Sequence, residues 1–195
     1  MPVLLTHNRQ ERKMKVLYLS DRDEDMTKMM HLQTRYETEV PSIYSSDFEM
    51  LTQKYGDWVF MSQRELEDEM SRCVEVADEA IQTFCPDVVV SSSMGGAVHR
   101  LLIEEGLWQG PNVFLASADR KIFTNPRVGD NKSVWIHGRE DKKIPPAHSV
   151  KTARDADGTL VLTADDHSLN SILGSGLIDW AITTAVENSR CPTKN

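Results

Sequence analysis

The sequence predicts a single α/β domain built on a mostly parallel sheet of about six strands, with helices on both faces. Five short apolar runs, bounded by polar or turn-forming residues, are typical of strands buried on both faces. Stretches with helical spacing of apolar residues separate several of these runs. A length of 195 residues suits one complete core and is short for two. We therefore expect residues 1–14 to form an N-terminal tail and residues 15–190 to form the domain.

The first half of the domain shows two strands and two helices. Lys15–Leu19 is the first buried strand, and the methionine-rich residues 26–36 have the pattern of a helix. Thr38–Ile43 is a second strand, placed at the sheet edge because Pro41 lacks an amide hydrogen for pairing. Residues 62–84 begin with a capping box and carry one apolar stripe, which predicts an amphipathic helix packed on the sheet.

The second half begins with Val88–Val90, a β-branched run that ends in a cluster of small residues. A helix follows directly, from Met94 to a C-terminal cap at Gly106. Three further short apolar strands are predicted at 112–116, 133–137 and 159–163. The last helix is predicted at 168–186, interrupted or softened by Gly174 and Gly176.

Composition excludes several functional classes. The formal net charge of −8 argues against non-specific binding to nucleic acid or to an anionic membrane. No signal peptide or membrane-spanning segment is recognisable. The chain has three cysteines, Cys73, Cys85 and Cys191, and they lack the paired spacing of a zinc site. We therefore expect reduced thiols in the cytoplasm and no disulfide framework.

Ser93 lies between the strand at 88–90 and the helix that starts at Met94. A serine at this junction is exposed at the positive end of the helix dipole and is adjacent to backbone N–H groups that can bind an oxyanion. The segment Ser91–Gly96, SSSMGG, resembles the nucleophile elbow G-x-S-x-G of the α/β-hydrolase family, with Ser91 in place of the first glycine. The alternative is a small-residue turn in another doubly wound domain, which would cradle a phosphate.

Two later strand ends extend the resemblance to the α/β-hydrolases. The segment HGREDKKIPP is similar to the family's H-G-x-x-D segment, and it places Asp141 at the position of the triad acid. The segment after the last strand, ADDH, resembles the one that supplies the family's histidine, here His167. Ser93, Asp141 and His167 then follow the family's order. Glu140 and Asp166 are neighbouring acids that this spacing does not select.

The resemblance implies a role for each residue. Ser93 is expected to be the nucleophile, His167 the base and Asp141 the group that orients the imidazole. The backbone N–H of Met94 is one expected oxyanion donor. The second is expected after the first strand, from Arg22 or Asp21, where many relatives have His-Gly instead.

The resemblance therefore implies a small serine hydrolase that cleaves a small carboxylic ester or thioester through an acyl-enzyme. No apolar helix fits between residues 117 and 132, so we expect no lid. The aromatic residues between 48 and 60 either pack in a loop under the domain or line the acyl pocket. We expect a small-molecule acyl substrate, no cofactor and no metal. The alternative is a non-catalytic module of the same fold that binds a ligand or a protein, because the expected oxyanion loop departs from the family pattern.

Overall fold

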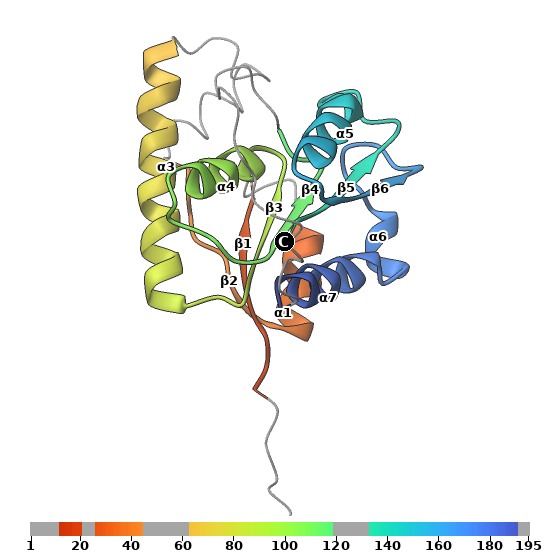
Figure 1. Cartoon of the computed structure of the whole chain (residues 1–195), viewed down its shortest axis with the longest axis horizontal. Coiled ribbons are helices and arrows are strands. Elements are labelled where there is room, and N and C mark those ends of the chain that lie inside the picture. Colours follow the sequence, from red (N-terminus) through yellow and green to blue (C-terminus); the bar gives the residue numbers. More distant parts are fainter. Residues whose placement is uncertain (1–11, 21–25, 45–62, 119–132, 191–195) are drawn as a thin grey trace, which may run out of the picture.

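The computed structural model describes residues 12–20, 26–44, 63–118 and 133–190 (Figure 1). Within these ranges six strands form one fully parallel sheet in the order β2-β1-β3-β4-β5-β6. The strands are β1 (Lys15–Leu19), β2 (Glu37–Glu39), β3 (Val88–Ser92), β4 (Asn112–Leu115), β5 (Ser133–Gly138) and β6 (Thr159–Thr163). The helices are α1 (Met26–Arg35), α3 (Gln63–Phe84), α4 (Met94–Glu104), α5 (Pro146–Asp155), α6 (Ser171–Gly174) and α7 (Leu177–Arg190).

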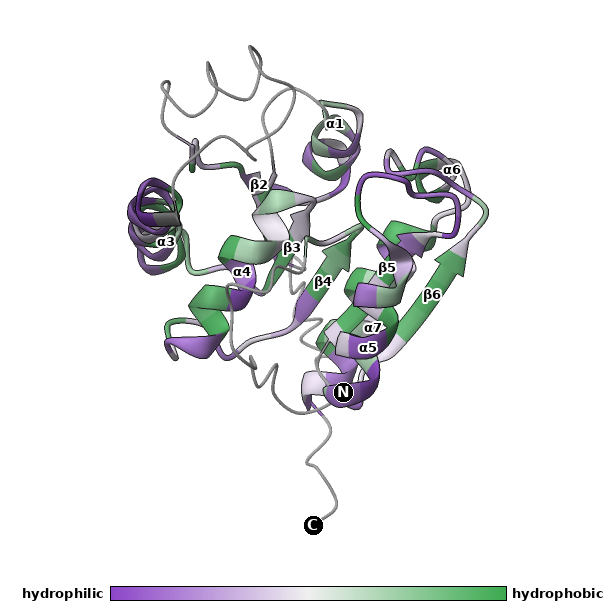
Figure 2. Ribbon diagram, turned by 90° about the horizontal axis from the view of Figure 1, so that it is seen from above, coloured by the Kyte–Doolittle hydropathy of each residue, from purple (hydrophilic) through white to green (hydrophobic). Residues whose placement is uncertain are grey.

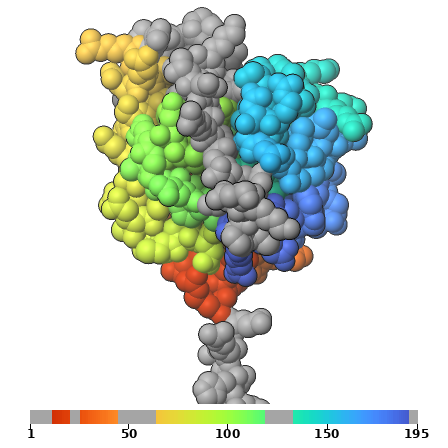
Figure 3. Space-filling model, in the orientation of Figure 1, coloured from red at the N-terminus to blue at the C-terminus, as the bar shows by residue number. Residues whose placement is uncertain are grey.

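Helices cover both faces of the sheet, as the sequence predicts. Alternate strand residues point to opposite faces, so β1 sends Val16 and Tyr18 to one core and Leu17 and Leu19 to the other. The first core packs against α1, α6 and α7, and the second packs against α3 and α4. Helix α5 packs on the second face, against aromatic side chains of β4 and β5. Figure 2 shows the strands between these helices. In the view of Figure 3, α3 lies at the left and α5 at the right of the molecule.

The expected strands agree closely with the observed ones, and β1 and β6 have the expected bounds. The second strand is shorter than expected, because β2 spans only Glu37–Glu39, but it does lie at the sheet edge. The C-terminal helix, which we expected to be interrupted or softened by Gly174 and Gly176, is divided at these residues into α6 and α7. Gly176 has a φ of 71°, a left-handed conformation that separates α6 from α7.

Helix α5 has no counterpart among the expected elements. Its buried residues are Ser149, Thr152 and Ala153, which are small or polar, so the sequence lacks the apolar stripe by which a helix is recognised. Pro146 at the first position supplies a start signal, since proline is favoured in the first turn.

No helix in the described part of the chain is both long and apolar enough to cross a membrane. The carboxyl ends of parallel strands share one edge of the sheet, where functional sites form in this class of fold. Ser93 directly follows β3 at this edge, Asp141 follows β5 by three residues, and His167 follows β6 by four.

Candidate active site

Ser93 occupies a strained turn between β3 and α4. Its backbone has φ 51° and ψ −123°, a conformation that residues with a side chain rarely adopt. Its neighbours hold it in place. The Ser93 N–H donates to the Leu115 carbonyl at 3.1 Å, and its own carbonyl accepts from the N–H groups of Gly96 at 3.1 Å and Ala118 at 2.9 Å. The strained turn is therefore anchored to β4 and to the residues that follow it.

Two glycines allow the helix after Ser93 to approach the sheet. A Cβ added to Gly95 would lie 2.1 Å from the carbonyl oxygen of Leu19, at the end of β1. A Cβ added to Gly96 would lie 2.1 Å from the Ser117 hydroxyl. Neither distance is possible for real atoms, so any larger residue at these positions would displace α4 and with it Ser93.

Asp141 presents a fully buried carboxylate in the turn after β5. One oxygen, Oδ1, accepts hydrogen bonds from the backbone N–H groups of Lys143 and Ile144, each at 2.9 Å. The other, Oδ2, lies 2.7 Å from Nδ1 of His167 and 3.1 Å from Nε2 of His137. Four donors surround the carboxylate, which compensates its loss of hydration and fixes its orientation.

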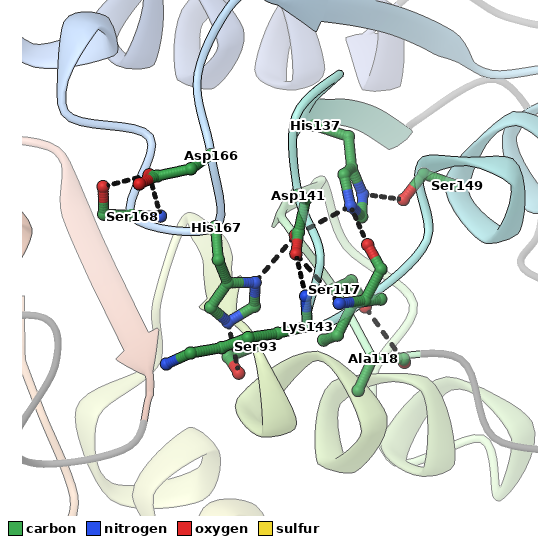
Figure 4. A network of polar contacts seen from close by, with 11 residues as sticks. Ser93, Ser117, Ala118, His137, Asp141, Lys143, Ser149, Asp166, His167 and Ser168 are labelled. Carbon is green, nitrogen blue, oxygen red and sulfur yellow. Dashed lines mark hydrogen bonds and ion pairs between the residues drawn. The ribbon is translucent and has the colours of Figure 1, made fainter.

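His167 connects Asp141 to Ser93, as Figure 4 shows. Its Nε2 lies 3.0 Å from the Ser93 hydroxyl, and its side chain is 11% exposed. Because an ionised carboxylate only accepts hydrogen bonds, Nδ1 carries the proton and donates to Asp141. Nε2 of the neutral ring is then free to accept the Ser93 hydroxyl proton. The structure thus brings together the three side chains expected from the sequence.

The loop carrying Asp141 and the loop carrying His167 are joined through their backbones. The Arg139 N–H donates to the Thr163 carbonyl and the Glu140 N–H donates to the Asp165 carbonyl, both at 3.0 Å. Gly138 makes this approach possible, because a Cβ there would lie 2.2 Å from the Asp165 oxygen. Two bonds between backbones therefore set the distance between acid and base.

The two neighbouring acids point elsewhere. Glu140 is exposed. Asp166 is exposed as well and accepts hydrogen bonds from the backbone N–H and the hydroxyl of Ser168, which hold the pKa of Asp166 below its usual value. Of these acids, only Asp141 contacts His167 among the hydrogen bonds of the described residues.

Other expected site features are only partly visible. Met94 is the first residue of α4, where backbone N–H groups have no partner within the helix. Its part as an oxyanion donor stays a prediction. Arg22 and Asp21 lie outside the described residues. The same holds for the aromatic residues between 48 and 60 that were candidates for the acyl pocket, and for residues 119–132, where no lid is expected. Within the described ranges, no group of three His, Cys, Asp or Glu side chains is arranged to hold a metal ion.

Two buried histidines were given no role from the sequence. His137, at the end of β5, contacts Asp141 directly. The histidine of the H-G-x-x-D segment was the available signal for it. Nδ1 of His99 on α4 accepts a hydrogen bond from the Ser91 hydroxyl, and Nε2 donates one to the Asn112 side-chain oxygen, both at 3.0 Å. Burial lowers the pKa of His99 to about 3, so this ring is neutral.

Solved structures resemble this fold along nearly the whole chain. A member of the α/β superfamily of hydrolases from Xanthomonas campestris pv. campestris matches with a TM-score of 0.61 and 17% identity, over 90% of this chain and 97% of that chain. A dienelactone hydrolase from Anabaena variabilis matches with a TM-score of 0.63 and 13% identity, over 93% of this chain and 89% of that chain. A carboxylesterase from Bacillus cereus matches with a TM-score of 0.56 and 11% identity, over 88% and 89%.

No family model matches the sequence. No curated protein matches it either. The likeness therefore concerns the arrangement of helices and strands, which these hydrolases share with this chain.

Proposed function

We propose that this chain, which has the α/β-hydrolase fold, is a serine hydrolase that cleaves a small carboxylic ester or thioester through an acyl-enzyme. The observation that carries the proposal is the continuous series of hydrogen bonds from Ser93 Oγ through His167 to the buried Asp141. The similar solved structures support hydrolysis as the reaction class, since they include a carboxylesterase and a dienelactone hydrolase.

In the proposed acylation step, the Ser93 oxygen attacks the acyl carbonyl while its proton moves to Nε2 of His167. The charged imidazole is stabilised by Asp141 across the 2.7 Å hydrogen bond. The Met94 amide, with a donor from residues 21 or 22, would bind the oxyanion. Collapse of the intermediate transfers the proton from His167 to the leaving alkoxide or thiolate. A water molecule, deprotonated in the same way, then releases the acid and regenerates Ser93.

The proposed substrate is a small molecule with a short acyl group, because the sequence offers no apolar helix for a lid between residues 117 and 132. Hydrolysis of p-nitrophenyl esters of graded chain length tests this choice. We expect the highest kcat/KM with short acyl chains. A maximum with long chains would contradict the expectation. A cytoplasmic location stays a prediction from the sparse cysteines.

Covalent labelling tests the mechanism most directly. The folded protein should react with a fluorophosphonate probe, and mass spectrometry of the digest should place the adduct on Ser93. The variant Ser93→Ala should not be labelled. The matched control is Ser92→Ala, because Ser92 is the adjacent serine but is buried in β3 and makes no contact with His167 among the described hydrogen bonds. This control should still be labelled on Ser93.

The competing proposal is a non-catalytic module that binds a ligand or a protein. Its support is the Ser20-Asp21-Arg22 sequence, which has an acidic residue where many relatives have His-Gly. A folded wild-type protein that neither reacts with the probe nor hydrolyses any ester of the series would favour this alternative.

A further inference from the structure

His137 is a buried residue in direct contact with Asp141 that has no part in the proposed mechanism. The ring is fully buried at the end of β5, and each of its nitrogens has a partner. Nδ1 lies 2.7 Å from the Ser149 hydroxyl on α5. Nε2 lies 3.0 Å from the Ile144 carbonyl oxygen and 3.1 Å from Oδ2 of Asp141.

These partners determine where the proton of His137 resides. The Ile144 carbonyl and the ionised Asp141 carboxylate can only accept, so Nε2 must carry the hydrogen and share it between them. Burial lowers the pKa of His137 and favours the neutral ring, in which Nδ1 accepts a hydrogen bond from the Ser149 hydroxyl. Ser149 thereby selects the tautomer of His137 that donates to Asp141.

Oδ2 of Asp141 is consequently shared by two imidazoles, one in β5 and one in the loop after β6. His137 donates at 3.1 Å from the end of β5, and His167 donates at 2.7 Å from beyond β6 (Figure 4). The two backbone donors on Oδ1 hold only one end of the carboxylate. Rotation about the bond to Cβ moves both carboxylate oxygens together, and each of the four donors opposes it. Loss of His137 removes one of these four donors, the second one on Oδ2, so the direction of the Oδ2 lone pairs toward His167 would be less well defined.

We infer that His137 is a positioning residue for hydrolysis, which holds Oδ2 of Asp141 so that the carboxylate stays aligned with Nδ1 of His167. The inference rests on the proposed function. It assigns His137 an effect that passes entirely through Asp141, because His137 has no contact with Ser93 among the described hydrogen bonds.

The test uses three substitutions of His137 in the full chain. His137→Gln places an amide N–H close to the position of Nε2, so it can still donate to Asp141. His137→Asn carries the same amide on a shorter side chain, near the position of Nδ1, and does not reach. His137→Leu removes the donor. We expect kcat with a p-nitrophenyl ester to fall about ten- to a hundredfold in the Asn and Leu variants, at nearly unchanged KM, since a hydrogen bond to a charged group is lost. His137→Gln should recover most of this loss.

A double-mutant cycle separates positioning from packing. In the Asp141→Asn background the carboxylate is already absent, so adding His137→Asn should cost less than threefold. If His137 only fills space, its substitution should cost the same factor in both backgrounds, and the inference is overturned. Equal activity of the Asn and Gln variants would also overturn it.

His99→Gln is the matched control, because His99 is equally buried but bonds to Ser91 and Asn112 and has no described contact with Asp141. It should lower the thermal unfolding midpoint while leaving the ratio between the His137→Gln and His137→Asn activities unchanged. If His137→Leu does not fold, the kcat values of His137→Gln and His137→Asn still test the inference, because both variants carry an amide of similar polarity. Wild-type protein without ester hydrolysis or Ser93 labelling overturns both proposals, whereas active wild type with equally active His137→Asn overturns this one alone.

Discussion

Ser91 stands where the elbow pattern prefers glycine, and its hydroxyl has a specific partner. The side chain is fully buried, and Oγ lies 3.0 Å from Nδ1 of His99, eight residues further along the chain. The interaction continues to Asn112, whose amide nitrogen donates to the Ser133 hydroxyl at 3.0 Å. A glycine at position 91 would leave Nδ1 of His99 buried without this donor.

Restoring the family's glycine should therefore destabilise the protein. Ser91→Gly should lower the free energy of unfolding by about 1–3 kcal/mol for the unpaired nitrogen, with a further 0.5–1 kcal/mol or so from glycine in a strand. Ser91→Ala isolates the hydrogen bond. Urea denaturation monitored by circular dichroism measures both. A glycine variant as stable as the wild type would mean that the hydroxyl contributes nothing.

Asp141→Asn tests the charge of the proposed acid. The substitution keeps the shape of the side chain, but the amide group can donate to Nδ1 of His167 and so favours the wrong tautomer. We expect kcat to fall on the order of 10⁴-fold, because the same substitution in the triad of a serine protease has an effect of this size. Ester hydrolysis measures the rate, and Glu140→Gln is the control, because Glu140 is exposed and should be dispensable.

The elements of this fold contribute to the site through close contacts between backbones. Gly138 ends β5 and lies against the carbonyls of Asp165 and Asp166, the two residues that precede His167. The two loops therefore behave as one unit, and a disturbance of either changes the distance between Asp141 and His167.

Gly138→Ala should reduce stability and activity together. Its Cβ would lie 2.2 Å from the Asp165 carbonyl oxygen, so the loops must separate. We expect the free energy of unfolding to decrease by about 1–3 kcal/mol, as for other overpacked sites, and kcat to fall. Thermal unfolding and ester hydrolysis measure the two effects. Gly174→Ala is the control: no atom lies within 4 Å of the added Cβ, and alanine in α6 should be neutral or stabilising.

Sequence periodicity predicted the elements that bury apolar side chains. It missed α5, whose buried side chains are small or polar. Each of β1, β3 and β5 is a run of buried, mostly apolar residues, so each was recognisable in the sequence. Helix α5 buries serine, threonine and alanine, which a solvated loop could equally contain. Periodicity alone does not separate α6 from α7, because the two helices continue one apolar pattern, but Gly174 and Gly176 indicated the interruption.

At the scale of the whole molecule, the buried histidines make stability depend on pH. The pKa of His99 falls from 6.5 to about 3 on folding, because burial disfavours the charged ring. Between these values the unfolded chain binds a proton that the folded chain excludes. The contribution of neutral His99 to the free energy of unfolding is therefore complete above the pKa of the unfolded state. It is lost as the pH falls toward the pKa of the folded state. Burial lowers the pKa of His137 as well, so this residue acts in the same direction.

The free energy of unfolding should consequently decrease on acidification from about pH 7 to 5, by about 2 kcal/mol from His99 alone. Urea denaturation at several pH values measures this slope. His99→Gln is the comparison, since glutamine does not titrate, and its slope should be smaller. An equal slope in the two proteins would show that the proton is taken up elsewhere.

The order of the chain, and not the composition of any one segment, made the candidate site recognisable. Serine, aspartate and histidine each follow a separate strand, and the structure brings all three side chains to one edge. The sequence did not predict that His137 and Ser149 support the carboxylate, because the contact depends on α5, which no apolar pattern revealed. Their parts in catalysis stay predictions.

The reactivity of Ser93 should depend on the native structure, because its strained backbone conformation forms only there. Its strained conformation depends on hydrogen bonds to Leu115 and Ala118, which are available only once β4 lies beside β3. A partly opened molecule in which β4 has detached would keep much of its helix content, yet the serine would relax out of its reactive geometry. In a urea titration, probe labelling should then disappear before the helical circular dichroism signal. Coincident loss of the two would mean that β4 does not open separately.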